Sequence, residues 1–351
     1  MSGRAGAVEL VPVTGIGEIR RGTDLGTVIR DALRALDLRL ADGDVLVVSS
    51  KIVSKALGMR ESTDDKQALV LRHSHRIVTE RETPNGVTRV VHAKAGPVMV
   101  AAGIDASNVG DEGGYLTLPH DPDLAARSLY AELLAAYAPS PVPMIGIVLS
   151  DTAGRPWRLG QTDFALGSCG VAVLDDLRGG QDADGRDLTV TSRAVADEVA
   201  AAADLVKGKV GGIPVALVRG LPDGTVTDPG APGASYLVRT GPDDWFAHGV
   251  QEAVRAALGV EPGTAAAAQI GLPSVLPEDA RTRLDRAVRL ARFGEPEGST
   301  VEESPDDTGH LTLRVSGPDP VPVGRLAARL EVALRAERLA PPQVRVEVRG
   351  G

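Results

Sequence analysis

Two aspartates follow apolar segments at points where a carboxylate could hold a metal ion. Asp105 follows the apolar residues 98–104, and Asp151 follows the apolar residues 144–149 and one serine. We expect both segments to be buried strands, and a hard oxygen ligand just past such a strand suits Mg²⁺ or Mn²⁺. Each aspartate taken alone could equally close a turn or cap a helix. The repeated pattern favours a metal site.

Lysine is used sparingly, because only six of the 38 basic residues are lysines. Four of the six form two close pairs, Lys51 with Lys55 and Lys207 with Lys209. An ammonium group neutralises a phosphate as a compact charge, and nearby glycines let the backbone approach the phosphate oxygens. The glycines beside the second pair are Gly208, Gly211 and Gly212. Although a single lysine is more often a surface residue, the pairs predict a phosphate site.

Other candidate sites have less support. The chain has no GxxxxGK[ST] pattern, which excludes a Walker-type nucleotide site. His73 and His75 have no matching second pair of metal ligands, and the single cysteine, Cys169, excludes an intrachain disulfide. The Arg-Pro-Trp-Arg sequence at 155–158 could form an exposed cation–aromatic patch or could simply pack against the fold.

The composition limits the class of protein. The chain has 351 residues, of which 43% are hydrophobic, so it can bury a sizeable core. Its net charge of −9 argues against a nucleic-acid coat, but a local group of cations could still bind a small anion. It has no apolar run long enough to span a bilayer and no apolar signal core at the N-terminus. We expect a soluble cytoplasmic protein with no nucleic-acid or membrane partner.

Hydrophobic periodicity predicts the elements that position these residues. The expected strands span 8–13, 45–48, 89–92, 97–104, 143–149 and 213–218. The expected helices span 25–36, 122–136 and 191–205, and Thr23 is expected to cap the first of them. Strands and helices do not alternate regularly, so the predicted class is α+β.

The character of the sequence changes after about residue 238. A helix is expected over 245–258, followed by a linker rich in Ala, Gly and Pro at 259–273. A small α/β unit follows, with helices expected at 277–293 and 323–338 and strands at 310–316 and 344–348. The predicted domains are therefore residues 1–245, a helix and linker at 246–272, and a small α/β domain of unknown role at 273–351.

Eight stretches in order over residues 8–245 resemble the F420-0:γ-glutamyl ligase family. Three of them are DGDVLVVSSKIVSK at 42–55, SDTAGRPWR at 150–158 and ADLVKGK at 203–209. The other five span 102–109, 118–123, 187–191, 194–198 and 214–220. The resemblance implies an enzyme that uses GTP to add L-glutamate, through a γ-glutamyl amide bond, to the deazaflavin cofactor F420-0. It also implies a mixed-sheet ligase domain, a homodimer with intertwined sheets, and an acyl-phosphate intermediate.

The resemblance also implies roles for individual residues. The implied metal ligands are Asp105, Asp151 and Thr152, for Mg²⁺ or Mn²⁺, with K⁺ as a further cation. Lys51, Lys55 and Arg155 are expected to take part in catalysis, and Arg155 and Arg158 could hold the acidic tail of the substrate. The implied nucleotide contacts are Ile16, Gly17, Glu18, Ile19, Ser50, Lys51, Lys55, Asn108, Lys207, Gly208, Lys209, Gly211 and Gly212.

The chain departs from the family pattern in three places. Archaeal members have a metal-ligating glutamate where Lys209 stands, and a protonated lysine cannot ligate a cation. The segment between Gly58 and Ile77 is shorter than in the archaeal form. Some actinobacterial relatives continue into a flavin-binding nitroreductase-like domain, for which the residues after Pro273 are too few.

These departures leave two alternatives open. The chain could be a ligase or phosphoryl transferase that acts on another acidic cofactor. It could also be a catalytically silent protein that binds a nucleotide or a deazaflavin.

Overall fold

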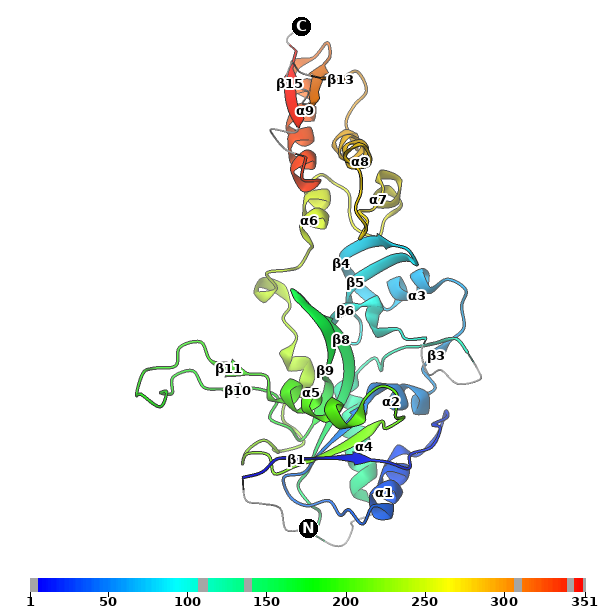
Figure 1. Cartoon of the computed structure of the whole chain (residues 1–351), viewed down its shortest axis with the longest axis vertical. Helices are drawn as coiled ribbons and strands as arrows, with labels where there is room; N and C mark the ends of the chain where they lie inside the picture. Colours follow the sequence, from blue (N-terminus) through cyan, green and yellow to red (C-terminus); the bar gives the residue numbers. More distant parts are fainter. Residues whose placement is uncertain (1–5, 107–112, 136–140, 306–310, 340–343, 350–351) are drawn as a thin grey trace. The chain divides into compact units, whose positions relative to one another are not determined.

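The computed structural model describes residues 6–106, 113–135, 141–305, 311–339 and 344–349. Contacts divide the chain into two compact units (Figure 1). The first unit comprises Met1–Ser74 and His92–Asp243, and the second comprises His75–Val91 and Asp244–Gly351. The protein is of mixed α and β structure with several sheets, as the sequence predicts.

A five-stranded mixed sheet forms the centre of the first unit. Its strand order is β1-β12-β2-β8-β9, and only β2 and β8 run parallel. The strands are β1 (Glu9–Val13), β12 (Val215–Arg219), β2 (Val45–Ser49), β8 (Gly146–Arg155) and β9 (Arg158–Cys169). Strands β1, β2 and β12 confirm the strands that were expected from the apolar runs at these places.

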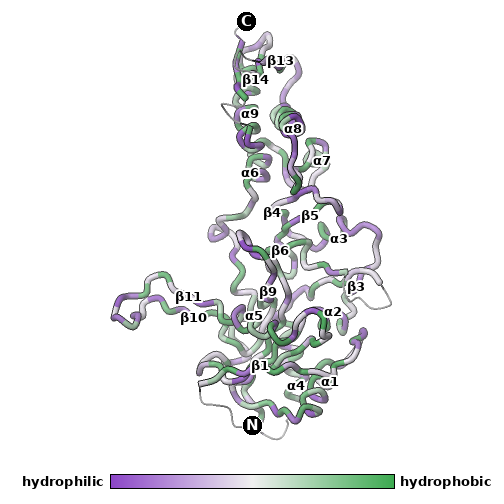
Figure 2. Tube along the Cα trace, viewed as in Figure 1, coloured by the Kyte–Doolittle hydropathy of each residue, from purple (hydrophilic) through white to green (hydrophobic). Residues whose placement is uncertain are grey.

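Alternating side chains of this sheet pack against helices on both faces. Leu46 and Val48 of β2 belong to the same core as the inward residues of α1 (Leu25–Ala35) and α4 (Pro122–Leu134). Val45 and Val47 belong to a second core with α5 (Val195–Lys207). Figure 2 shows hydrophobic residues gathered where β1, α2 and α4 of this unit lie together. A sheet buried on both faces gives a rigid base for the residues at its edge.

Two helix ends in this unit are fixed by local chemistry. Helix α1 is capped by Asp24, whose carboxylate accepts from the backbone N–H of Thr27, so the expectation of a cap at Thr23 is wrong. Helix α2 (Ser50–Leu57) starts directly after β2 and ends at Gly58, which has a left-handed φ of 71°. This short connection ties the position of α2 to the end of β2.

Residues 97–104 do not form one continuous strand. Strand β6 covers only Val98–Val100 and is followed by a short 3-10 turn over Ala101–Gly103. Ala101 and Ala102 have positive φ values of 51° and 54°, which side chains other than glycine rarely adopt. The chain therefore turns sharply just before Asp105.

Smaller elements complete the first unit. Asp105 makes an isolated antiparallel bridge with Leu116. The other elements are β3 (Arg60–Glu61), α3 (Lys66–Arg72), β7 (Tyr115–Leu116), β10 (Asp175–Asp176) and β11 (Ser192–Arg193). The strands of this group form two short pairs, β3 with β7 and β10 with β11.

The second unit contains a three-stranded sheet with helices packed on one face. Strand β13 is antiparallel to β14, and β14 is parallel to β15 through the crossover helix α9. Its elements are α6 (Val250–Ala257), α7 (Ala265–Ile270), α8 (Ala280–Arg292), β13 (Thr300–Pro305), β14 (Leu311–Ser316), α9 (Pro320–Ala336) and β15 (Val344–Val348). Ala267 and Ile270 of α7 are buried in this core, so the segment expected to be a linker is part of the folded unit.

The strands β4 (Ser74–Thr83) and β5 (Gly86–Ala93) contribute residues 75–91 to this second unit. The backbone of Glu82 bonds to Pro273 and Val275, and the buried carboxylate of Glu80 accepts from Arg89 and from the N–H of Gly263. The hairpin is thus joined to residues 170 or more positions later. The domain boundaries expected from the sequence, at 245 and 272, remain predictions. The sequence did not predict that this hairpin belongs to the second unit.

A buried ion cluster gives a stability prediction for the second unit. Arg286 of α8 donates two bonds to each of two carboxylates, those of Glu278 and Glu337, at 2.5–2.8 Å, and its side chain is 3% exposed. We expect Arg286→Ala to lower the free energy of unfolding by about 3–5 kcal/mol, because it leaves the buried carboxylate of Glu337 and the half-buried carboxylate of Glu278 without the cation that bonds them. Arg281→Ala, on the exposed part of the same helix, is the control and should change little. Equal thermal unfolding midpoints for the two variants would contradict this reading of the cluster.

None of the helices in the described part of the chain is long and apolar enough to cross a membrane.

Candidate active site

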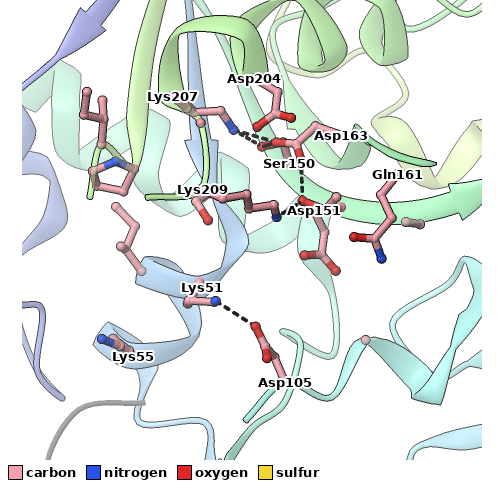
Figure 3. A pocket seen from close by; sticks show the side chains of 18 of the residues that line it. Lys51, Lys55, Asp105, Ser150, Asp151, Gln161, Asp163, Asp204, Lys207 and Lys209 are labelled. Carbon is pink, nitrogen blue, oxygen red and sulfur yellow. Dashed lines mark hydrogen bonds and ion pairs between the residues drawn. The ribbon is translucent and has the colours of Figure 1, made fainter. Parts of the chain in front are cut away.

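One cavity of about 850 Å³ in the first unit collects most of the residues expected to do chemistry (Figure 3). Residues from the loop after β1, from α2, from β8 and from the end of α5 line it. The expected site residues on its wall are Ile16, Gly17, Glu18, Ile19, Lys51, Lys55, Asp105, Asp151, Thr152, Lys207, Gly208, Lys209 and Gly212. Segments far apart in the sequence therefore meet at one place.

The sheet register explains why the first lysine pair meets the second aspartate. Strands β2 and β8 are parallel neighbours, and Ser49 is paired with Ser150. The residue after Ser150 is Asp151, while the chain after Ser49 turns into α2 and carries Lys51. Lys51 and Lys55 are four residues apart and so lie on the same side of that helix.

Lys51 forms an ion pair with Asp105. The distance from Lys51 Nζ to Asp105 Oδ2 is 2.7 Å, and the two side chains are 26% and 41% exposed. Figure 3 shows the Asp105 and Asp151 side chains extending toward the cavity from different elements. The two aspartates singled out by the sequence pattern thus line the same space.

The second lysine of this helix is more deeply placed. The Lys55 side chain is only 7% exposed, and its Nζ lies 2.5 Å from Glu18 Oε1. Glu18 belongs to the loop after β1, and its own side chain is more than half exposed. This ion pair fixes the loop that carries Ile16 and Gly17 against the helix.

Lys207 lies at the end of α5 and is almost fully buried. Its Nζ donates to Asp163 Oδ2 at 2.7 Å and to Ser150 Oγ at 2.6 Å, and Ser150 Oγ in turn donates to Asp163 at 2.9 Å. Ser150 is on the α5 face of β8, because side chains alternate along a strand and Val148 packs in the α5 core. Lys207 therefore reaches these groups directly from its helix.

Asp163 connects the two lysines of the second pair. Strand register places Thr152 opposite Asp163, and Thr152 Oγ1 donates to Asp163 Oδ1 at 2.6 Å. Thr152 Oγ1 also accepts a hydrogen bond from the ammonium of Lys209. Burial raises the pKa of Asp163, but Lys207 and the three hydrogen bonds outweigh it, so the pKa lies below its usual value. Asp163 is therefore a carboxylate that stays ionised and orders its neighbours.

Asp151 has the opposite electrostatic character. Burial, with smaller contributions from the charges of Asp163 and Asp105, raises its pKa to about 6, although the backbone N–H of Thr152 and the charge of Lys209 act in the opposite direction. The positive charge near the Asp151 carboxylate thus does not compensate for its burial and for the neighbouring negative charges. A cation bound at this point would favour its ionised form.

The residues present fit a divalent cation that is shared with a phosphate ligand. Among the described residues, no group of three His, Cys, Asp or Glu side chains is placed to hold a metal on its own. Mg²⁺ is usually held by one or two carboxylates together with substrate phosphates and water. Asp105 and Asp151 bring two carboxylates to the wall of one cavity, which is the number that this pattern requires.

The sequence suggested that Asp151 follows a strand, but in the structure it lies within one. Strand β8 continues to Arg155 because it pairs with β9 beyond the end of its apolar run, and Asp151 lies opposite Phe164. Arg155 and Arg158 are exposed at the far end of this hairpin and are not on the cavity wall.

Two other expected site residues, Ser50 and Gly211, are not on the cavity wall. Ser50 is buried, and the wall is formed instead by its neighbour Ser49. Gly211 is likewise off the wall, which its neighbour Gly212 lines. Asn108 lies outside the described residues.

The sequence interpretation missed several wall residues. Asp163 and Gln161 were not found because the strand that carries them, β9, was not expected. Asp204 of α5 and Lys66 at the start of α3 also line the cavity. The scarcity of lysine in the sequence could have pointed to Lys66. The wall has five of the six lysines of the chain, and only Lys94 lies elsewhere.

The comparisons with known proteins all indicate the same family. The sequence profile of a family described as F420-0:gamma-glutamyl ligase matches residues 15–220, a range that contains every wall residue of the cavity. A coenzyme F420:L-glutamate ligase of Archaeoglobus fulgidus is 39% identical over 231 residues, covering 61% of this chain and 88% of that protein. An enzyme of the same name from Methanothermobacter thermautotrophicus is 35% identical over 248 residues, covering 66% and 96%. A third, from Natronomonas pharaonis, is 37% identical over 238 residues, covering 60% and 86%.

Proposed function

This chain belongs to the F420-0:gamma-glutamyl ligase family and is a ligase, and on that premise we propose that it adds L-glutamate to coenzyme F420-0 with GTP as co-substrate. The observation that carries the proposal is the convergence of five lysines and four aspartates, Asp105 and Asp151 among them, on one cavity within the matched range. The same premise supports a homodimer, whose test is the molecular mass of the protein in solution.

The chemistry requires an activated carboxylate. A carboxylate does not condense with an amine at neutral pH, because its carbon is a poor electrophile and the leaving group would be oxide. Transfer of the γ-phosphoryl group of GTP to a carboxylate oxygen gives GDP and an acyl phosphate. The glutamate amine then attacks the carbonyl carbon, phosphate leaves, and the amine nitrogen loses a proton.

The protein's share of this reaction is positioning and charge neutralisation. Lys51, Lys55 and Lys209 line the cavity with ammonium groups that can approach the phosphates. Their present partners are Asp105, Glu18 and the Thr152 hydroxyl. Binding of the nucleotide would exchange these contacts for phosphate oxygens, so the cations are held in place before the ligand arrives.

Lys207 has a different part, because its ammonium is already bound by Asp163 and Ser150. It holds the hairpin that carries Asp151 and Thr152 against the end of α5. A divalent cation held by Asp105 and Asp151 beside the Thr152 hydroxyl would supply further positive charge to the transferred phosphoryl group.

Lys209 gives a prediction about metal binding. Its ammonium contacts the hydroxyl of Thr152, at a position where the family resemblance implies a glutamate ligand. We expect Lys209→Glu to increase the number of Mn²⁺ ions bound in the presence of GTP, because it replaces a cation by a hard oxygen ligand. Lys209→Met, which removes the charge without adding a ligand, is the control. A Mn²⁺ titration that is identical for wild type and Lys209→Glu would count against placing Lys209 at the metal.

The experiment that tests the function is the mass of the product. Purified protein is incubated with GTP, Mn²⁺, L-glutamate and F420-0, and the products are measured by mass spectrometry. The proposal expects a deazaflavin heavier by one glutamyl residue, with one GDP formed per glutamate added. GTP binding without any such product would overturn the proposal and favour a silent nucleotide-binding protein. Addition to a different acidic acceptor but not to F420-0 would overturn the assignment of the substrate.

A further inference from the structure

We propose that Lys66 binds an anionic group of the acceptor substrate, a carboxylate or phosphate ester of the deazaflavin, and so contributes to acceptor specificity. The inference rests on the proposed function. It adds one binding residue that the family motifs in the sequence do not mark.

The first observation is how the other lysines of the cavity are engaged. Each of these four ammonium groups lies against an oxygen atom of the protein. The lysines are Lys51, Lys55, Lys207 and Lys209, and their respective partners are Asp105, Glu18, Asp163 and Thr152. Their positions are therefore set by charge pairing or hydrogen bonding inside the site.

Lys66 is held in another way. Its Nζ lies over the ring of Tyr115, 5.7 Å from the centroid, and no carboxylate within the described ranges forms an ion pair with it. A cation–π contact orients an ammonium group but leaves its N–H donors available. The half-buried side chain thus presents a directed positive charge to the cavity that it lines.

The location of Lys66 points to the acceptor. Tyr115 is followed by Leu116, whose backbone is bridged to that of Asp105 in both directions, at 2.9 and 3.1 Å. Lys66 is therefore on the part of the wall next to Asp105, where the carboxylate that receives the phosphoryl group must come close to the nucleotide. An acidic acceptor has a second anionic group to be neutralised there.

The wall of the same cavity also has apolar residues that suit a ring system. Met99, Val100 and Ala101 line the cavity and are contributed by β6 and the sharp turn after it. Apolar side chains and a fixed cation on the wall of one cavity form a pattern expected for a ligand with an aromatic body and an acidic tail. Glutamate has no such body, whereas the guanine of GTP is also a ring, so the separate KM values for F420-0 and GTP decide which of the two this wall receives.

Steady-state kinetics with Lys66→Met tests the inference. The KM for F420-0 should rise about tenfold to a hundredfold, the effect expected when one hydrogen bond to a charged group is lost. The KM values for GTP and glutamate and the value of kcat should stay within about threefold. Lys66→Arg, which keeps the charge, should recover part of the loss. Lys94→Met, at the one lysine that does not line the cavity, is the matched control and should behave as wild type.

A rise in the KM for GTP or for glutamate, with the KM for F420-0 unchanged, would overturn the inference. Direct binding of F420-0, followed by its fluorescence without GTP, separates this failure from failure of the proposed function. If wild type binds F420-0 but forms no product, and Lys66→Met weakens binding by the same factor, the inference stands and the catalytic proposal fails. If Lys66→Met binds F420-0 as well as wild type does, the inference fails whatever the turnover. A wild-type protein that neither binds nor converts F420-0 overturns both.

Discussion

Asp151→Asn should lower kcat for GTP-dependent glutamate addition by roughly a thousandfold, without unfolding the protein. The amide keeps the size of the side chain but removes the negative charge that the proposed cation needs. Asp151 lines the same cavity as Asp105 and Lys209, and its charge interacts with the charges of both. The rate of GDP formation and the product mass, measured with saturating Mn²⁺, check this expectation.

The control for Asp151→Asn is Asp176→Asn, which removes an exposed carboxylate paired with Arg178 outside the cavity. It should retain wild-type turnover. Turnover of Asp151→Asn within a few-fold of wild type would remove Asp151 from the metal role.

Asp163→Asn should affect both stability and turnover. The substitution leaves the buried ammonium of Lys207 without a counter-charge. It also weakens the hydrogen bonds that the hydroxyls of Ser150 and Thr152 donate to residue 163. We expect a loss of about 3–5 kcal/mol in the free energy of unfolding, as for other broken buried ion pairs. We also expect a fall in kcat of roughly tenfold to a hundredfold, typical of residues that orient the ligands of a site. Chemical denaturation and steady-state assays measure the two effects.

A double variant separates the two effects of Asp163. Asp163→Asn combined with Lys207→Met removes both buried charges and should recover most of the lost stability. It should not recover turnover, because the hairpin would still lack the bonds that hold Thr152. Recovery of both properties would show that Asp163 acts on stability alone, and recovery of neither would contradict the ion-pair explanation.

The central strands of the fold could be predicted from the sequence because their apolar runs are buried on both faces. Val45–Val48 and Ile213–Val218 are examples, and the structure confirms strands at both places. The limits of β8 could not be predicted in the same way, since its second half is polar and is held by pairing with β9. Apart from the exposed Leu159, residues 158–163 of β9 are also polar or glycine, so no hydrophobic pattern marks that half of the strand.

The residues of the site likewise fall into those that the sequence could predict and those that it could not. The lysine pairs, Asp105 and Asp151 were found because their spacing is local, and the structure brings them to one cavity. Asp163 could not be found, because its contacts depend on the hairpin register that sets it opposite Thr152. The pairing of Lys207 with Asp163 was missed for the same reason, since it joins residues 44 positions apart.

The second unit shows a further limit of prediction from sequence. The family profile ends at residue 220, yet the hairpin at residues 75–91, which lies within the profile, is joined to residues from 244 onward. Buried charges, not apolar periodicity, make part of this connection, for example Arg81 with Glu252 and the carboxylate of Glu80 with the N–H of Gly263. Such pairs cannot be read from the hydrophobic pattern of either segment.

The most direct test of the central claim is an anomalous-scattering map from crystals grown with Mn²⁺ and a non-hydrolysable GTP analogue. We expect a manganese peak bounded by the carboxylates of Asp105 and Asp151, with the triphosphate beside Lys51, Lys55 and Lys209. A triphosphate bound outside this cavity, or manganese bound in the crystal away from both aspartates, would contradict the account.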